Sequence, residues 1–309
     1  MSKMCSDLIR HDLSGATMGT RWHAQLWTDA DAAPGLTQAM QNAVDRVDAQ
    51  MSLWKPDSDL NRLNAAPVGA WTELPAEIMT VLDRALQIGR ASGGAFDISV
   101  EPAVRAWGFG PGTADMDRAR DLLSETRHRP AHEVLELDRG RGAARKAAPA
   151  RFDLGGIAKG YGTDCLIAAA MAQGTTALTA GIDGDLRSIG LRPDGTAWPV
   201  AIEAPDYDRR AAHSLIELTD MAVATSGDYR HWVQLGDKRL SHTINPRLGS
   251  PLTTSPASVT VLAEECMSAD AWATALMVLG AEDGNTVARA LGIKAMFLER
   301  PGGETQPAA

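Results

Sequence analysis

Residues 161–202 read YGTDCLIAAAMAQGTTALTAGIDGDLRSIGLRPDGTAWPVAI, and this stretch decides the fold class. Its first part, residues 161–173, is rich in alanine, leucine and isoleucine and predicts a buried helix opened by glycines. Its second part predicts strands at 178–180 and 198–202, because short apolar runs there are separated by glycine, aspartate and proline turns. A helix that gives way to a run of strands favours an α+β fold over a strict alternation of strands and helices.

The same reasoning extends outward in both directions. Toward the C-terminus, the pattern predicts strands at 215–218, 231–235 and 258–262, two helices at 269–279 and 285–291, and a last strand at 295–298. Toward the N-terminus, it predicts helices at 34–51 and 75–92 and strands at 22–27, 134–137 and 151–154. We therefore expect mainly antiparallel sheets flanked by helices.

The composition is that of a soluble globular chain. Its 309 residues, 44% of them hydrophobic, are enough for a sizeable core, and no linker divides them, so we expect a single compact body. Acidic residues outnumber basic ones by 39 to 30 without any basic block, which weighs against a nucleic acid as partner. Cys5, Cys165 and Cys266 are too widely spaced for a disulfide framework or a CxxC site.

No part of the sequence offers the run of about 18 apolar residues that a membrane span needs. The opening residues also lack the apolar segment of a secretory leader. We therefore expect a cytoplasmic protein, or a periplasmic one if a leader was removed before this chain was made.

Residues 152–162, FDLGGIAKGYG, are the first segment that could carry chemistry. Here a predicted strand runs into glycines and then into a helix whose first turn holds Lys159. Such a helix start, with free N–H groups and a nearby ammonium, suits a phosphate. The segment is not a Walker A loop, and the chain has no GxGxxG. The alternative is a helix start whose glycines serve packing and whose lysine is solvated.

Asp270 and Thr274 form the second candidate. They are four residues apart, so on a helix a carboxylate and a hydroxyl lie on the same face. A hard cation such as Mg²⁺ takes one or two such oxygen ligands and completes its shell with water and phosphate. The alternative is a helix N-cap, a common role for Asp.

His242 lies in SHTINP, residues 241–246, where a strand ends in a turn. It could donate to a phosphate oxygen or take a proton from an attacking hydroxyl, and the alternative is a structural hydrogen bond within the turn. Residues 93–98, GGAFDI, are by default a helix end followed by a strand. A serine hydrolase is excluded, because the chain has no GxSxG and Ser226 lacks that elbow pattern.

Taken together and in this order, these segments resemble the ApbE family of bacterial FAD:protein FMN transferases. The resemblance runs from about Thr17 to Leu298 and implies a single compact body of two interlocked subdomains. It places the domain at 17–299, between an N-terminal extension at 1–16 and a C-terminal tail at 300–309. The motifs that carry it are MGT at Met18, MSLW at Met51, GGAFD at Gly93, DLGGIAKGYG at Asp153, ATSGDYR at Ala224, SHTINP at Ser241 and ADAWATALMVLG at Ala269.

The resemblance also implies a reaction. Members of the family bind FAD, use Mg²⁺, split the pyrophosphate and attach the FMN half to a threonine or serine hydroxyl of a target flavoprotein, releasing AMP. A base takes the proton of that hydroxyl, and His242 or a nearby carboxylate is our candidate. The flavin-nucleotide contacts carried over from the family are Met18, Trp54, Ala95, Phe96, Asp97, Asp153, Lys159 and Ile244. The metal ligands carried over are Asp270, Thr274 and the backbone carbonyls of Gly156 and Ala273.

Two residues depart from the family pattern. Many members carry tyrosine where Trp54 stands, and an indole N–H only donates whereas a phenol also accepts. Asp183 stands where the family usually shows a second glycine, and a carboxylate there would repel a phosphate unless it points away. Two alternatives to transfer follow, a Mg²⁺-dependent FAD pyrophosphatase giving FMN and AMP, or a non-catalytic FAD-binding protein.

Overall fold

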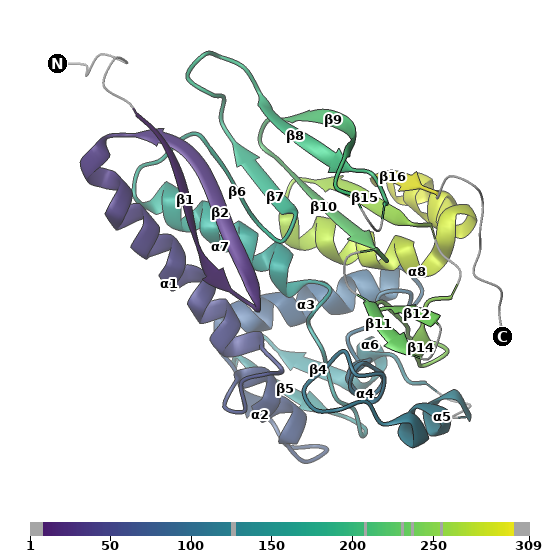
Figure 1. Ribbon diagram of the computed structural model, residues 1–309. Coiled ribbons are helices and arrows are strands. Elements are labelled where there is room, and N and C mark those ends of the chain that lie inside the picture. The colour runs from purple at the N-terminus through teal and green to yellow at the C-terminus, as the bar shows by residue number, and fades with distance from the viewer. Residues whose placement is uncertain are drawn as a thin grey trace.

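The computed structural model describes residues 9–124, 128–206, 209–229, 232–235, 238–253 and 256–299. Its largest element is a seven-stranded sheet in which every neighbouring pair of strands is antiparallel (Figure 1). The predicted α+β class with antiparallel sheets is therefore confirmed. In spatial order the strands are β1 (Ile9–Thr17), β2 (Thr20–Thr28), β6 (Leu178–Ile182), β7 (Asp185–Ile189), β10 (Met221–Gly227), β15 (Ser258–Ala263) and β16 (Lys294–Leu298).

Three helices cover one face of this sheet, namely α1 (Ala33–Met51), α7 (Ala158–Ala172) and α8 (Cys266–Leu291) (Figure 1). The apolar spacing that predicts α1 also buries it, because Leu36, Met40 and Val44 all lie in the core. The apolar α7 lies between α1 and α8. Among the described residues, no helix combines the length and apolar character needed to cross a lipid bilayer.

A separate hairpin covers part of the opposite face of the sheet. It consists of β8 (Trp198–Glu203) and β9 (Ala212–Leu218), which form a two-stranded sheet of their own among the described residues. Side chains of β10 alternate between the two faces, so Ala224 joins the core under the helices while Val223 packs against Val200 and Ile202 of the hairpin. The sheet therefore has an apolar layer on both sides at its centre.

The second part of the molecule is built from short elements. They are the helices α2 (Asp59–Ala65), α3 (Ala76–Ala91), α4 (Glu101–Ala106), α5 (Met116–Ser124) and α6 (Ala131–Val134), the three-stranded sheet of β3 (Thr72–Glu73), β4 (Leu135–Asp138) and β5 (Ala143–Lys146), and the hairpins β11 (Trp232–Leu235) with β12 (Lys238–Ser241) and β13 (Ile244–Asn245) with β14 (Ser250–Pro251). The 3₁₀ helix η2 (Ala30–Ala32) instead joins β2 to α1 in the first part. One buried cluster joins Leu82 of α3 to Val261 of β15 and Leu276 of α8. The chain is thus a single compact body, as expected.

The strand predicted at 151–154 is wrong, and the structure shows why. Phe152 and Leu154 are buried, which produces the alternating pattern, but no strand in the described part of the chain pairs with this segment. The side chain of Asn64 takes the place of a neighbouring strand. It accepts from the Phe152 backbone N–H at 2.7 Å and donates to the Phe152 carbonyl at 2.9 Å.

Other differences concern elements that the sequence pattern does not reveal. The two helices predicted near the C-terminus form one element, α8, interrupted at Gly280, where φ is 79°. The sequence pattern does not reveal β1, β7, β10, α2, α4 or α5, and all of β1 except Thr17 lies in the stretch set apart as an N-terminal extension. His231, the first residue of a predicted strand, lies outside the described residues.

Two tight turns lie at the same end of the large sheet. Met18 and Gly19 join β1 to β2 with φ values of 47° and 72°, and Asp183 and Gly184 join β6 to β7 with φ values of 50° and 95°. Positive φ at both central residues marks the type I′ hairpin, which favours glycine and tolerates aspartate. Because β2 pairs with β6 near these turns and β10 ends beside them, this end of the sheet gathers several loops.

Candidate active site

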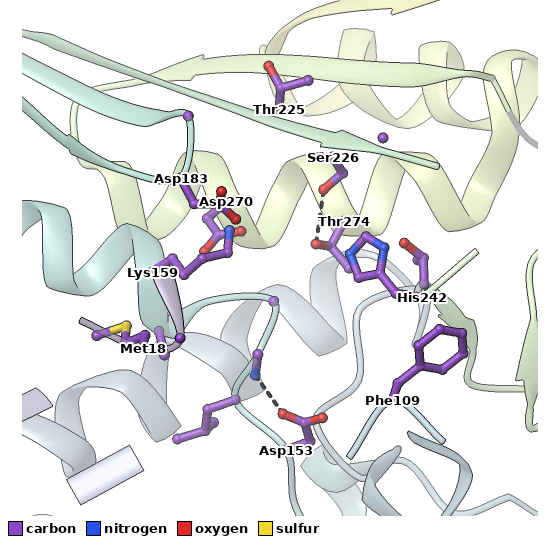
Figure 2. Close-up of a pocket in the computed structure, with 18 of the residues that line it drawn as sticks. Met18, Phe109, Asp153, Lys159, Asp183, Thr225, Ser226, His242, Asp270 and Thr274 are labelled. Atoms are coloured by element: carbon purple, nitrogen blue, oxygen red, sulfur yellow. Dashed lines mark hydrogen bonds between the residues drawn. The ribbon is translucent and has the colours of Figure 1, made fainter. Parts of the chain in front are cut away.

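A cavity of about 1470 Å³ opens at this end of the sheet (Figure 2). It is bordered by both tight turns, the end of β10 and the first turns of α7 and α8. Ala273 does not line it and is fully buried on α8, directly before Thr274. All the other residues singled out from the sequence do line it: Met18, Trp54, Ala95, Phe96, Asp97, Asp153, Gly156, Lys159, His242, Ile244, Asp270 and Thr274.

Near their N-terminal ends, α7 and α8 are joined by reciprocal hydrogen bonds, in which a carboxylate of each helix accepts from backbone N–H groups of the other. Asp270, the fifth residue of α8, accepts from the backbone N–H of Gly160 at 3.0 Å. Asp164 of α7 in turn accepts from the backbone N–H groups of Cys266 and Met267 at 3.0 and 2.9 Å. Asp164 is therefore the residue that satisfies the free N–H groups of α8, and the alternative in which Asp270 caps its own helix is wrong.

Gly160 allows the two helices to approach so closely. A Cβ at this position would lie 2.4 Å from the carbonyl oxygen of Cys266 and 2.8 Å from Cβ of Asp270. Neither helix could move away without breaking the hydrogen bonds from Asp270 to Gly160 and from Asp164 to Cys266 and Met267. Gly160 therefore serves helix packing, as the alternative interpretation of these glycines predicts, and this packing holds Asp270 at the cavity.

Lys159 is not a solvated lysine. Its ammonium donates to the buried carboxylate of Asp185, with 2.6 Å between Nζ and Oδ2. Burial opposes the charge of Lys159, but Asp185, Asp270 and Asp183 together outweigh it and raise the pKa of the ammonium. Lys159 therefore stays positively charged in the lining of the cavity, where Figure 2 shows it beside Asp183 and Asp270.

Thr274 lies one helical turn after Asp270, so its hydroxyl and that carboxylate share one face of α8. The Thr274 hydroxyl lies 3.2 Å from that of Ser226 (Figure 2). A Cβ on Gly156 would lie 3.2 Å from Thr274 Oγ1, which places the 155–156 loop against the same hydroxyl. Among the described residues, no group of three or more His, Cys, Asp or Glu side chains could hold a metal. One carboxylate, one hydroxyl and backbone carbonyls nevertheless fit Mg²⁺, which binds few protein side chains.

Asp153 lies on the loop that leads into α7 and lines the cavity. Its Oδ1 accepts from the Gly155 backbone N–H at 2.7 Å (Figure 2). Burial raises the pKa of the Asp153 carboxyl to about 6, and the nearby Glu101 adds to the shift. A carboxyl that titrates this close to neutrality is also a candidate base.

The raised pKa of Asp153 makes a prediction for stability. Between about pH 4 and pH 6 the folded protein binds more protons at this carboxyl than the unfolded chain does, so stability falls as the pH rises through that window. Asp153→Asn keeps an oxygen for Gly155 but carries no charge. We expect its Tm to exceed that of the wild type by about 2 °C or more near pH 8 and to show no such gain near pH 4.

Thermal unfolding of both ligand-free proteins across this range measures the effect. An equal difference at both ends of the range would show that the carboxyl of Asp153 is not perturbed in the folded protein.

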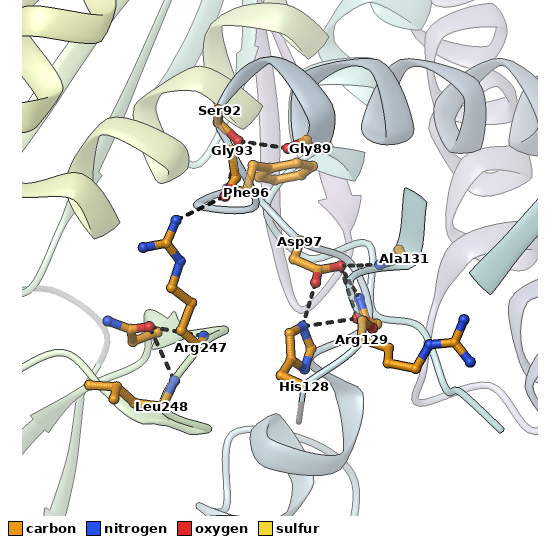
Figure 3. Close-up of polar contacts among 12 residues, drawn as sticks. Gly89, Ser92, Gly93, Phe96, Asp97, His128, Arg129, Ala131, Arg247 and Leu248 are labelled. Atoms are coloured by element: carbon orange, nitrogen blue, oxygen red, sulfur yellow. Dashed lines mark hydrogen bonds and ion pairs between the residues drawn. The ribbon is translucent and has the colours of Figure 1, made fainter. Parts of the chain in front are cut away.

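A second polar network holds the loop that contains Ala95, Phe96 and Asp97 (Figure 3). Asp97 Oδ1 accepts from the backbone N–H groups of Ser99 and Ala131 and from the Ser99 hydroxyl, each at 2.9 Å. Its Oδ2 lies 2.5 Å from Nε2 of His128. These bonds from the Asp97 carboxylate hold the loop in place at the cavity, and the contact of Asp97 with the flavin nucleotide stays a prediction.

His242 and Ile244 come from the segment around β13. His242 extends into the cavity from the connection between β12 and β13 (Figure 2). Ile244 is buried against Ala103 and Val104 of α4. The following turn is tied to the loop of Figure 3, because the Arg247 guanidinium donates to the Gly93 carbonyl at 3.0 Å. This contact links two motifs that are distant in the sequence.

Two aromatic or strained positions border the mouth of the cavity. Trp54 follows α1 and is 66% exposed, so its indole is free to stack on a ligand without displacing core residues. Met18, in the β1–β2 turn, has a left-handed backbone conformation, which is uncommon for a residue other than glycine.

Four further residues of the site could not be identified from the sequence, namely Asp164, Asp185, His128 and Ser226. Each is recognised only by a contact with a residue distant in the sequence.

Comparisons with known proteins agree with this geometry. The profile of the ApbE family matches residues 18–297. The FAD:protein FMN transferase of Vibrio cholerae serotype O1 is 36% identical over 291 residues, covering 93% of this chain and 86% of the relative, and that of Escherichia coli K12 is 33% identical over 298 residues, covering 94% and 84%. Among solved structures, flavinyl transferase ApbE of Pseudomonas stutzeri in its apo form superimposes with a TM-score of 0.84 at 34% identity, covering 96% of this chain and 92% of that one.

Proposed function

The chain belongs to the ApbE family and moves FMN from FAD to a target protein, and we propose that it does so with Mg²⁺ and with a threonine or serine hydroxyl of the target as acceptor. One observation carries this proposal. Asp270 and Thr274 present a carboxylate and a hydroxyl from one face of α8 to the cavity, beside the charged ammonium of Lys159. Oxygen ligands and a fixed positive charge at one point are what a pyrophosphate and its cation require.

The size of the cavity supports a large substrate. Its volume of about 1470 Å³ exceeds the roughly 300–1,000 Å³ of ordinary small-molecule pockets. A dinucleotide together with part of an acceptor polypeptide needs such room. The apolar wall formed by Phe96 and the exposed indole of Trp54 suit the flavin end, and Lys159 suits the phosphates.

Asp270, Thr274 and the backbone carbonyl of Gly156, which all line the cavity, would hold the metal, whereas Ala273, the fourth ligand expected from the family, does not line it. When bound there, Mg²⁺ supplies Lewis-acid stabilisation of charge on the phosphate oxygens. The residues of the chain do the rest. The paired ammonium of Lys159 offsets phosphate charge, and the closely packed starts of α7 and α8 keep Asp270 in place.

In the transfer itself, the acceptor oxygen bonds to the phosphorus of the FMN half, the bond to the phosphate of AMP breaks, and AMP leaves with the electron pair. His242 takes the proton of the attacking hydroxyl, and Asp153 is the second candidate for this role because its pKa is raised to about 6. Holding the hydroxyl in line with phosphorus is what favours it over water.

Incubation of the protein with FAD, Mg²⁺ and a candidate acceptor encoded near its gene tests the proposal. We expect the acceptor to gain the mass of one FMN, AMP to be released in equal amount, and both to be lost when the acceptor threonine is replaced by alanine. Equal amounts of AMP and free FMN, formed at the same rate with and without acceptor, would identify a pyrophosphatase. Bound FAD without any AMP would identify a non-catalytic FAD-binding protein.

A further inference from the structure

Three of the other helical threonines bond within their own helix, whereas Thr163 of α7, like Thr274, bonds outside its helix, to the Asp185 carbonyl at 3.3 Å. Thr37, Thr80 and Thr286 each donate their hydroxyl to the carbonyl four residues earlier in the helix, at 2.9, 2.9 and 3.1 Å. This is a common local partner for a threonine hydroxyl inside a helix. The Thr274 hydroxyl instead makes one hydrogen bond to a described residue, Ser226 at the end of β10, at 3.2 Å. It is turned away from its own helix toward the cavity (Figure 2).

The neighbours of this hydroxyl leave it little freedom. Gly156 approaches from the loop before α7, where an added Cβ would lie 3.2 Å from Thr274 Oγ1 and 3.3 Å from the ring of Phe96. Ser226, at the end of β10, contacts the same hydroxyl from the sheet, and both Ser226 and Thr274 line the cavity. The Thr274 hydroxyl is therefore bordered by residues from two other segments of the chain, the loop before α7 and the end of β10.

We propose that Ser226 is a positioning residue that aims the oxygen of Thr274 at the Mg²⁺ site by accepting the proton of its hydroxyl in a hydrogen bond. The inference rests on the proposed function, because it requires a cation held by Asp270 and Thr274. It assigns a role to a strand residue that provides neither charge nor a predicted metal ligand.

The reason lies in how a hydroxyl binds a cation. A neutral hydroxyl that offers an oxygen lone pair to a metal must direct its single proton elsewhere. If Thr274 donated to the carbonyl in its own helix, as Thr37 and Thr80 do, its oxygen would turn back toward the helix backbone. Ser226 provides the alternative acceptor on the sheet side. Partners that orient a metal ligand in this way typically contribute about 10–100-fold to metal affinity.

Calorimetric titration of Mg²⁺ into the protein saturated with ADP measures this contribution, because ADP supplies a pyrophosphate without an FMN group. We expect Ser226→Ala to raise the Kd for Mg²⁺ by about 10–100-fold, while Ser226→Thr, which keeps a hydroxyl, stays close to the wild type. The matched control is Ser188→Ala. Ser188 on β7 donates a comparable 2.9 Å hydrogen bond to the Thr179 hydroxyl of β6, and this variant loses it. Because Ser188 does not line the cavity, the Kd of the variant for Mg²⁺ should be unchanged.

A double-mutant cycle decides whether Ser226 acts through Thr274. We expect Ser226→Ala to have no further effect on the Kd for Mg²⁺ once Thr274→Ala is present. Independent, additive losses would mean that Ser226 contacts the ion or the phosphates directly, and an unchanged Kd in Ser226→Ala would mean that it does not orient Thr274. Either result overturns this inference but leaves FMN transfer standing. Failure of the wild type to bind Mg²⁺ would overturn the metal assignment as well.

Discussion

Asp270→Asn is expected to lower the rate of AMP release from FAD by about 10²–10⁴-fold, since a bound metal provides several kcal/mol of charge stabilisation. The asparagine keeps an oxygen that can accept from Gly160, whose N–H now donates to Asp270 at 3.0 Å. It removes the negative charge, which is the property that a cation needs. The contact between α7 and α8 should therefore survive while the affinity for Mg²⁺ is lost.

The matched control for this variant lies on the same pair of helices. Asp164→Asn keeps one of the two oxygens that accept from the N–H groups of Cys266 and Met267 and replaces the other with an NH2 group, which cannot accept. It therefore weakens the contact between α7 and α8, but because Asp164 lies outside the cavity it should retain more of the activity than Asp270→Asn. AMP release and the increase in Tm on adding Mg²⁺ are measured for both variants. Full AMP release by Asp270→Asn would show that Asp270 does not bind the metal. An equal loss of activity in both variants would show that the loss comes from disturbed helix packing.

How much of this site could be predicted depends on the distance along the chain over which each feature acts. Asp270 and Thr274 could be paired from sequence because helical geometry alone places residues four apart on one face. Whether Asp270 caps its helix could not be decided in that way, because the answer depends on Asp164, which lies on another helix and satisfies the N–H groups of Cys266 and Met267. The pairing of Lys159 with Asp185 of β7 and that of Ser226 with Thr274 of α8 could not be predicted for the same reason, although the sequence did indicate Lys159 as a phosphate ligand.

The fold shows the same limit. Helix α1 was predictable because Leu36, Met40 and Val44 repeat at helical spacing. Strand β1 was not, because it forms an edge of the sheet and only its last residue, Thr17, is buried, which leaves no alternating apolar pattern. Residues 151–154 show the converse error, in which buried Phe152 and Leu154 alternate as in a strand but the backbone pairs with the side chain of Asn64.

His242→Ala is expected to lower the rate of FMN transfer by about 10²–10⁴-fold, the usual contribution of a positioned base. The backbone around it should stay in place, because Thr243 donates to the Ser241 hydroxyl at 3.2 Å and its carbonyl accepts from Leu252 at 2.9 Å. Binding of FAD should change little, so the loss should fall on kcat rather than on KM. Imidazole added to the solution should restore part of the rate, since it can occupy the space left by the side chain and take the same proton.

The rival base makes the opposite prediction. If Asp153 takes the proton, Asp153→Asn abolishes transfer at every pH, whereas His242→Ala remains active and imidazole has no effect. If His242 is the base, Asp153→Asn should weaken FAD binding through its place in the cavity wall yet leave kcat at saturating FAD largely intact. Comparing kcat, KM and imidazole rescue for these two variants therefore assigns the base, because only the residue that accepts the proton can show a kcat loss that a free imidazole repairs.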